Sequence, residues 1–177
     1  MIGRRAFLTG AGLLCAEAAA AAKSAMADGG SVRSVSFVHT HTGEKLTAAY
    51  WKDGEYQPQV LQQVNHLLRD FRTNEVHTMD PALLDLLFEL RTKVGSQLAF
   101  HVISAYRSPK TNAMLRRSSS GVAEHSMHML GKAIDVRLES YPTDRLAEAA
   151  RSLRRGGVGY YRASDFVHVD TGRVRYW

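Results

Sequence analysis

His128, Asp135 and His168 have the residue types and the spacing that a catalytic metal ion needs. The first two are seven residues apart and the third follows more than thirty residues later, so a close pair is combined with one distant ligand. A catalytic Zn²⁺ takes three nitrogen or oxygen ligands and keeps its fourth position for a water molecule, whose pKa falls to about 7. The chain contains eight histidines, so spacing alone leaves surface or hydrogen-bonded core roles open.

The local sequence predicts how these side chains are positioned. Gly131 permits a tight turn before the apolar run 133–136, which is typical of a strand and carries Asp135. Aromatic and β-branched residues alternate with other types along 166–170, which predicts a second strand and places His168 on it. A ligand on a sheet can be held rigidly.

Several short motifs occur in the same order as in a known group of enzymes. They are Ser-Ala-Tyr-Arg-Ser-Pro at 104–109, Ser-x-His-x-x-Gly-x-Ala-x-Asp at 126–135 and Val-His-Val-Asp at 167–170. In these motifs the chain resembles the LAS-type zinc metallopeptidases, which include D-Ala-D-Ala carboxypeptidases, dipeptidases and phage endolysins. The ending, from Gly-Gly-Val-Gly-Tyr-Tyr at 156–161 onward, is similar to the exported bacterial branch of murein endopeptidases. The resemblance spans residues 35–177.

The expected fold is α+β, a single domain with helices packed on a mostly antiparallel sheet. The resemblance implies the LAS/hedgehog-like form of that fold, with one Zn²⁺ ion held by His128, Asp135 and His168. It also implies a hydrolase that cuts peptide bonds in the stem peptides or cross-links of peptidoglycan. Two alternatives stay open, namely a D-Ala-D-Ala carboxypeptidase of the same fold and a zinc-bearing cell-wall-binding module without catalysis. A serine hydrolase using Ser126 is a weaker reading, because no Gly-x-Ser-x-Gly motif surrounds it.

Three further residues are candidates for the catalytic machinery. Arg107 matches the family arginine that contacts substrate and stabilises the oxyanion formed when water attacks a peptide carbonyl. For the general base, Asp165 stands three residues before His168, where many relatives have a glutamate with a longer side chain. Asp170 is the rival, because in a strand it shares a face with His168, yet it could instead hold a ligand in its orientation. The sequence leaves both assignments open.

The first 27 residues have the features of an export signal. Paired arginines precede a short alanine-rich apolar run, and small residues before Asp28 fit a cleavage site. The arginine pair indicates the twin-arginine route, which carries folded proteins across the membrane. The apolar run is too short and too weakly hydrophobic for a comfortable membrane span. We therefore predict a signal peptide at 1–27, a zinc metallopeptidase domain at 28–177, and a periplasmic or otherwise exported protein without a stable membrane anchor.

Composition narrows the possible partners. Cys15 is the only cysteine, so the mature domain would have no internal disulfide, and its length suffices to bury a core. The formal net charge is +6, and basic residues gather at 116–117 and between 145 and 155. These residues could favour an anionic polymer such as the cell wall. A solvated helix face is the simpler explanation for them. Nucleic acid is a poor candidate, because the signal exports the chain and no recognition motif is present. We expect a monomer with peptidoglycan as its partner.

Periodicity predicts the remaining elements. The expected strands lie at about 31–38, 46–51, 98–104 and 158–161, and the expected helices at 58–71, 81–94, 111–116 and 142–155. The second helix has Asp80 as its N-cap and Gly95 at its end. His39 and His41 share one face of the first hairpin, and without an acidic or cysteine partner nearby we expect them to be structural.

Overall fold

Buried residues alternate with more exposed ones along the first strand of a single sheet. The computed structural model describes residues 31–119 and 121–177, and the signal peptide predicted at 1–27 lies outside the described residues. In β1 (Val32–His39), Val35, Phe37 and His39 are buried and the residues between them are more exposed. β2 (Lys45–Lys52) pairs with it in antiparallel fashion, which confirms the predicted hairpin.

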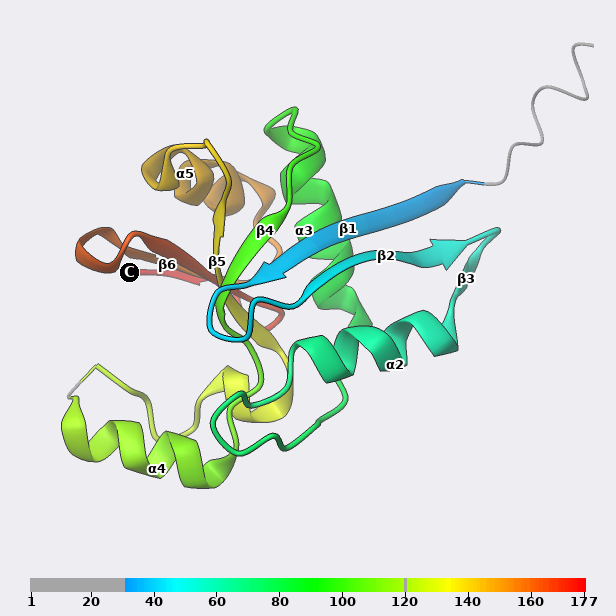
Figure 1. Cartoon of the computed structure of the whole chain (residues 1–177). Coiled ribbons are helices and arrows are strands. Elements are labelled where there is room, and N and C mark those ends of the chain that lie inside the picture. Colours follow the sequence, from blue (N-terminus) through cyan, green and yellow to red (C-terminus); the bar gives the residue numbers. More distant parts are fainter. Residues whose placement is uncertain (1–30, 120) are drawn as a thin grey trace, which may run out of the picture. The chain divides into compact units, whose positions relative to one another are not determined.

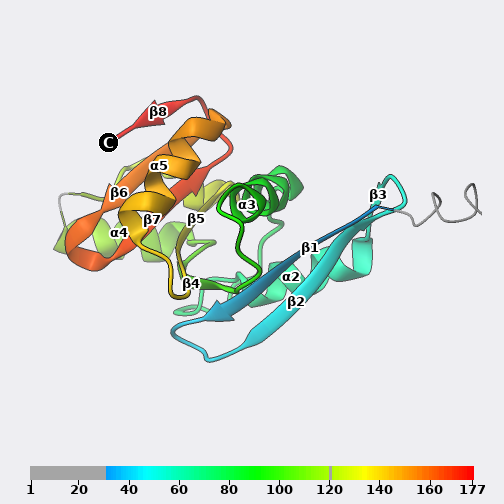
Figure 2. The ribbon, with the colours of Figure 1, turned by 90° about the horizontal axis from the view of Figure 1, so that it is seen from above.

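The sheet is mixed. Within the described residues its strands lie in the order β3, β2, β1, β4, β5, β7, β6, β8 (Figures 1 and 2). The further strands are β3 (Glu55–Tyr56), β4 (Phe100–Ser104), β5 (Ala133–Leu138), β6 (Gly157–Tyr161), β7 (Phe166–Asp170) and β8 (Arg175–Tyr176). β1 pairs with β4 and β6 pairs with β8 in parallel, and the other neighbours are antiparallel. The short strands β3 and β8 were not expected from the sequence.

Four α-helices occur in the described residues, and with the sheet they make the fold α+β. They are α2 (Pro58–Leu67), α3 (Pro81–Lys93), α4 (Pro109–Ser118) and α5 (Thr143–Leu153). α3 begins where the sequence predicts, because the Asp80 side chain accepts a hydrogen bond from the Ala82 backbone N–H at 3.0 Å. α3 and α5 lie side by side (Figure 2) and both contact the sheet. In the described residues no helix has the length and apolar character to cross a bilayer.

The apolar core fixes the two strands that carry predicted ligands. Ile134 and Val136 in β5, like Val167 and Val169 in β7, are fully buried and belong to one hydrophobic cluster with leucines of α3 and α5. Successive residues of a strand point to opposite faces. Asp135 and its partner on β7 therefore face away from this core.

The helix predicted at 58–71 is shorter than expected. α2 ends at Leu67, and the backbone of Asp70 then forms a bridge with Glu75. Leu68 is fully buried although it lies outside the helix. The apolar residues of the sequence extend beyond the helix because Leu68, in the turn that follows, packs on the same core.

Candidate metal centre and active site

A short capped turn presents His128. Ser126 precedes the 3₁₀-helix η1 (Met127–Leu130), and its hydroxyl accepts a hydrogen bond from the His128 backbone N–H at 3.3 Å. Gly131 ends the turn with φ +65°, and a Cβ there would lie 2.3 Å from the Thr78 carbonyl oxygen. Only glycine combines this left-handed backbone with so close an approach. The chain then enters β5 at Ala133, as the motif predicts.

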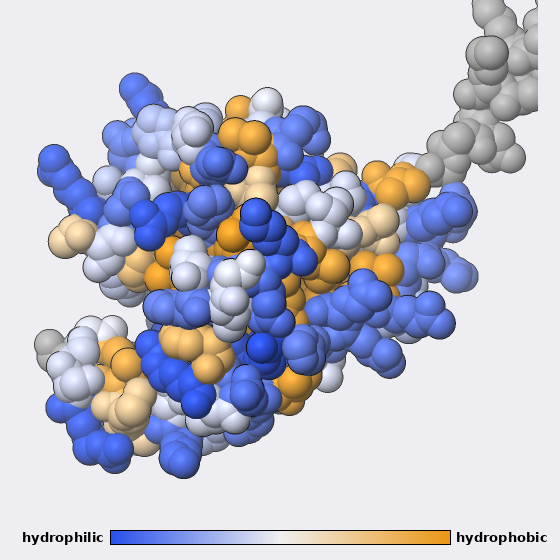
Figure 3. Space-filling view, in the orientation of Figure 1, coloured by the Kyte–Doolittle hydropathy of each residue, from blue (hydrophilic) through white to orange (hydrophobic). Residues whose placement is uncertain are grey.

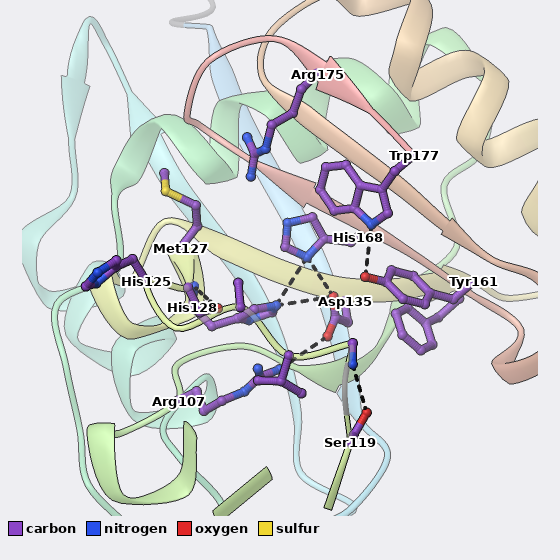
Figure 4. A pocket seen from close by; sticks show the side chains of 15 residues that line it. Arg107, Ser119, His125, Met127, His128, Asp135, Tyr161, His168, Arg175 and Trp177 are labelled. Carbon is purple, nitrogen blue, oxygen red and sulfur yellow. Dashed lines mark hydrogen bonds and ion pairs between the residues drawn. The ribbon is translucent and has the colours of Figure 1, made fainter. Parts of the chain in front are cut away.

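The second and third side chains face each other across neighbouring strands. Asp135 on β5 stands directly opposite His168 on β7. His128, Asp135 and His168 are 3, 6 and 7 % exposed, and Figure 4 shows them pointing toward one another. The structure thus brings together the three residues predicted from the motif spacing, and they form the one group in the described residues with metal-ligand geometry.

Three atoms of this group form a compact triangle. His128 Nε2 lies 3.2 Å from His168 Nδ1 and 3.3 Å from Asp135 Oδ1, and His168 Nδ1 lies 2.9 Å from Asp135 Oδ1. Ligands about 2.0–2.1 Å from a tetrahedral zinc ion are separated from one another by roughly 3.3 Å. The triangle therefore matches one face of a zinc tetrahedron.

The outer nitrogen of each imidazole is held by a hydrogen bond. His128 Nδ1 lies 2.7 Å from the Ala105 carbonyl oxygen, and His168 Nε2 lies 2.9 Å from Asp170 Oδ2. A carbonyl or carboxylate oxygen accepts, so the proton of each ring sits on this outer nitrogen. The lone pairs of His128 Nε2 and His168 Nδ1 are then directed at the centre of the triangle, as metal coordination requires.

The charges of the group favour a cation. Burial alone would raise the pKa of Asp135, but the two neighbouring histidines outweigh it and hold the pKa well below its usual range. Burial alone would also lower the pKa of His168, whereas Asp135 and Asp170 together raise it. An ionised carboxylate between two imidazoles is a donor set that suits Zn²⁺.

Asp170 is fully buried and its carboxylate is surrounded by donors. Besides His168, it accepts hydrogen bonds from the backbone N–H groups of Gly157 and Gly172, at 3.1 and 2.8 Å. The Arg175 guanidinium binds both oxygens, at 3.0 and 2.6 Å. Burial alone would raise the pKa of Asp170, but the hydrogen bonds from His168 and Arg175 outweigh it and lower the pKa. The carboxylate lies behind His168, on the side of the ring away from the triangle.

Asp165 is not brought to the triangle. Its carboxylate accepts hydrogen bonds from the Thr143 hydroxyl at 2.7 Å and from Arg137 at 3.1 Å, and its side chain is 59 % exposed. It lines a separate pocket with His101 and Arg137. The residue adopts φ +50° at the end of a 3₁₀ turn, so the chain bends before β7 but aims this side chain elsewhere.

Arg107 reaches the triangle from the loop between β4 and α4. Its backbone N–H donates to the His128 carbonyl oxygen at 3.2 Å, and its side chain is only 12 % exposed. One guanidinium nitrogen lies 3.4 Å from Asn112 Oδ1 and another lies 3.9 Å from Asp135 Oδ2. Burial lowers the pKa of Arg107, and the nearby Asp135 opposes this effect. The guanidinium is thus held beside the triangle as a fixed cation.

The triangle opens into a cavity of about 420 Å³. Figure 3 shows the corresponding hollow between the α4 region at lower left and the part of the molecule above it. The lining includes residues of the loop after α4 on one side and of β6, β7 and β8 on the other. Asp135 is the only carboxylate among the described residues that line it. His125 also lines the cavity but does not belong to the metal-ligand group.

One wall of the cavity was missed by sequence reasoning. Tyr161, Arg175 and Trp177 line it, and no role for them was predicted. A signal was present, because glycines at alternate positions of a strand often mark a close approach by another group. A Cβ at Gly157 would meet Arg175 at 2.4 Å, and one at Gly159 would meet the Trp177 ring at 2.6 Å.

The histidines of the first hairpin lie apart from this cavity. His39 is buried at the end of β1, and the His41 ring stacks on Phe71 with centroids 4.0 Å apart. Neither belongs to a metal-ligand group in the described residues. Their packing agrees with the structural role expected from the sequence.

Comparison with known proteins identifies the family. Residues 27–177 match the family model described as peptidoglycan L,D-endopeptidase MepK. The chain is 46 % identical over 146 residues to the probable peptidoglycan L,D-endopeptidase MepK of Haemophilus influenzae, covering 82 % of this chain and 78 % of that protein. It is 42 % identical over 137 residues to the peptidoglycan L,D-endopeptidase MepK of Escherichia coli K12, covering 77 % of this chain and 75 % of that one. No solved structure matches the chain significantly. These matches confirm the resemblance carried by the motifs, and the chain belongs to the peptidoglycan L,D-endopeptidase MepK family.

Proposed function

We propose that this protein is a zinc-dependent peptidoglycan endopeptidase that hydrolyses cross-link bonds between an L- and a D-configured centre. The observation that carries this proposal is the buried triangle of His128 Nε2, His168 Nδ1 and Asp135 Oδ1, with edges of 2.9–3.3 Å at the floor of a cavity. The names of the relatives from Haemophilus influenzae and Escherichia coli supply the bond type. The arrangement of ligands on η1, β5 and β7 supports the LAS/hedgehog-like form of the fold.

One Zn²⁺ ion would be held by these three atoms. When bound, the ion polarises the peptide carbonyl and activates water for attack. The three side chains would hold the ion at the lining of the cavity, where a substrate can reach it. Burial of the ligands keeps water from competing for their hydrogen bonds.

Arg107 would stabilise the negative charge that develops on the carbonyl oxygen. Its guanidinium is already fixed by Asn112 and by its approach to Asp135, so little reorganisation is needed during the reaction. A cation held at the cavity also favours peptide substrates that carry carboxylates, as stem peptides do.

We assign Asp170 to the orientation of His168 and not to proton transfer. Its oxygens are occupied by Arg175, two backbone N–H groups and the imidazole, and the lowered pKa makes it a poor proton acceptor. Asp165 is turned toward Arg137 and Thr143, so we assign it no part in the reaction. Neither of the two aspartates considered as general bases from sequence acts as one in this proposal.

The site of action would be the periplasm. We propose that residues 1–27 direct export by the twin-arginine route and that residues 28–177 act there as a monomer without a membrane anchor. The family match begins at residue 27, next to the proposed cleavage site, which supports this boundary. Peptidoglycan, the substrate in the relatives' names, requires export of the enzyme.

Digestion of purified sacculi tests the proposal. Mass spectrometry should show cross-linked muropeptides converted to uncross-linked products, and EDTA should abolish this conversion until Zn²⁺ is returned. His168→Ala should lose both metal and activity, whereas His41→Ala, outside the cavity lining, should keep both. Release of terminal D-alanine alone would indicate a carboxypeptidase, and binding to sacculi without cleavage would indicate a wall-binding module. Either result would contradict the endopeptidase.

A further inference from the structure

An aromatic wall stands beside the metal triangle. Tyr161 and Phe166 are opposite each other at the paired ends of β6 and β7, and their rings stack with centroids 4.6 Å apart. In Figure 4 the Tyr161 hydroxyl lies at the end of its ring nearer Asp135 and His168. Stacking on Phe166 leaves the ring little freedom to turn away. The phenol therefore belongs to the wall of the cavity into which the triangle opens.

Trp177 fixes this hydroxyl through one directed hydrogen bond. Its indole Nε1–H donates to Tyr161 Oη at 3.0 Å. Indole nitrogen is a donor only, so the phenol oxygen is the acceptor and its own hydrogen remains available. In the part of the chain that the structure describes, no protein acceptor takes that hydrogen. The hydroxyl can therefore donate to a molecule bound in the cavity.

Trp177 is itself held from several sides. Its backbone N–H donates to the Val158 carbonyl oxygen at 3.2 Å, and its carbonyl oxygen accepts from the Tyr160 N–H at 3.1 Å. The Arg175 guanidinium lies 5.0 Å from the indole centroid, within the range of a cation–π contact. Gly159 supplies the space that the ring occupies. These contacts hold the indole beside the phenol, although Trp177 is 47 % exposed.

The phenol and Arg107 lie on the same cavity. Both residues line it, together with His128, Asp135 and His168. When water attacks a peptide carbonyl held at the triangle, negative charge develops on the carbonyl oxygen. A neutral donor and a cation would then converge on that oxygen from the protein side.

We propose that Tyr161 is a catalytic residue whose hydroxyl donates a hydrogen bond to this oxyanion, and that Trp177 is a positioning residue acting through Tyr161. The inference rests on the proposed peptide hydrolysis. In the step itself the water oxygen bonds to the carbonyl carbon, the C–N bond breaks, and a proton from water ends on the leaving amine. Tyr161 keeps its own proton throughout.

Tyr161→Phe tests the hydroxyl while keeping the ring and its stacking. Because the hydrogen bond strengthens as charge develops, kcat should fall about 10²-fold with KM and zinc content nearly unchanged. Affinity for a phosphinate analogue of the scissile peptide, measured by calorimetry, should fall by about the same factor as kcat/KM. Tyr160→Phe is the matched control, since Tyr160 neighbours Tyr161 without lining the cavity. It should leave kcat, KM, zinc content and phosphinate affinity near those of the wild type.

Trp177→Phe tests the supporting role. It removes the indole N–H, so kcat should fall by a smaller factor than in Tyr161→Phe. In the Tyr161→Phe background the same change should have no further effect on kcat, because the hydroxyl it positions is already absent. Additive effects would show that Trp177 acts independently of Tyr161 and would overturn the positioning role.

The outcomes separate this inference from the proposed function. If the wild type cleaves cross-links and Tyr161→Phe retains its kcat, the catalytic role is overturned and the endopeptidase stands. A rise in KM alone would also overturn it, since the hydroxyl would then only bind substrate. If the wild type with zinc cleaves no cross-link, the proposed function fails and this inference fails with it.

Discussion

For Asp170, the sequence allows two alternative roles. Its position two residues after His168 fits a general base and fits an orienting carboxylate equally well. The distinction depends on the groups that occupy its oxygens, which include Arg175, five residues further along the chain, and Gly157 on β6. Spacing alone does not reveal this occupancy, because Gly157 reaches Asp170 only through the pairing of β6 with β7.

Asp170→Asn should weaken zinc binding more than it alters the chemistry. The amide cannot replace the charged acceptor that holds His168 Nε2–H and pairs with Arg175, so zinc affinity should fall about 10–100-fold. Competition with a chromophoric chelator measures this change. Asp165→Asn, whose carboxylate faces Arg137, should leave zinc affinity and turnover close to the wild type. A normal zinc affinity in Asp170→Asn with lost turnover would instead favour Asp170 as the base.

The clustering of the three proposed ligand residues, by contrast, was predictable from the sequence. His128 and Asp135 lie on one continuous turn and strand, so their spacing nearly determines their geometry. His168 was found through its strand alternation and the family motif. The hydrogen bond between Tyr161 and Trp177 was not predictable from the sequence. The two residues are 16 positions apart, and such a contact produces no periodic pattern along the chain.

Among the elements, the turn at Gly131 is the most sensitive to change. Gly131→Ala should lower the free energy of unfolding by more than the roughly 1–2 kcal/mol of a left-handed alanine, because the new Cβ also meets the Thr78 carbonyl at 2.3 Å. Gly95 has nearly the same backbone, with φ +66° and open space around it, so Gly95→Ala should show only the backbone cost. Urea unfolding of both variants measures the difference. Equal losses would show that the Thr78 contact is unimportant.

A second element, the loop that carries Arg107, is anchored by a buried carboxylate. Asp70 accepts hydrogen bonds from the Ser108 hydroxyl at 2.7 Å and from the Ser108 backbone N–H at 2.9 Å. Burial alone would raise the pKa of Asp70, but hydrogen bonds from Thr111, Ser108 and Arg72 outweigh it and lower the pKa to about 2. Ser108 also caps α4. The carboxylate thus joins the turn after α2 to the start of α4, next to Arg107.

This anchor predicts a specific dependence on pH. Because the pKa of Asp70 is lower in the folded chain than its ordinary value near 4, its stabilisation is present above about pH 4 and is lost as the pH falls toward 2. Asp70→Asn should destabilise the protein by about 2 kcal/mol at neutral pH and show a smaller loss of stability on acidification. Urea unfolding between pH 2 and 7 measures both effects. The exposed Asp53→Asn should behave like the wild type, and an identical pH profile for Asp70→Asn would contradict the anchor.

At the scale of the whole molecule, the zinc ion should connect folding to function. Its proposed ligands come from η1, β5 and β7, so binding would require the folded chain. At a free zinc concentration 100 times the Kd, the folded state should gain about 2.7 kcal/mol, and the melting temperature should rise accordingly. Calorimetric scans with EDTA and with zinc measure this shift. His168→Ala should abolish it and His41→Ala should preserve it, whereas a zinc-dependent shift in His168→Ala would place the ion elsewhere.

The order of the strands in the sheet could not be predicted from the sequence. Alternation in β1, β2, β6 and β7 indicated each strand and its nearest antiparallel partner, because short connections join antiparallel neighbours. The parallel pairing of β1 with β4 spans α2 and α3, and that of β6 with β8 joins strands separated by β7. Such pairings join strands that are not consecutive in the chain, and periodicity along the chain does not encode them.

The two imidazoles of the metal site present different nitrogens to its centre, Nε2 from His128 and Nδ1 from His168. With zinc bound, the rings are therefore frozen as opposite tautomers, one protonated at Nδ1 and the other at Nε2. Long-range ¹H–¹⁵N correlation spectra should distinguish them by their contrasting cross-peak patterns. Their N–H protons, shielded inside the protein, should exchange slowly with bulk solvent and give two separate downfield resonances. The same pair of signals would report on ion occupancy during a titration without any substrate present.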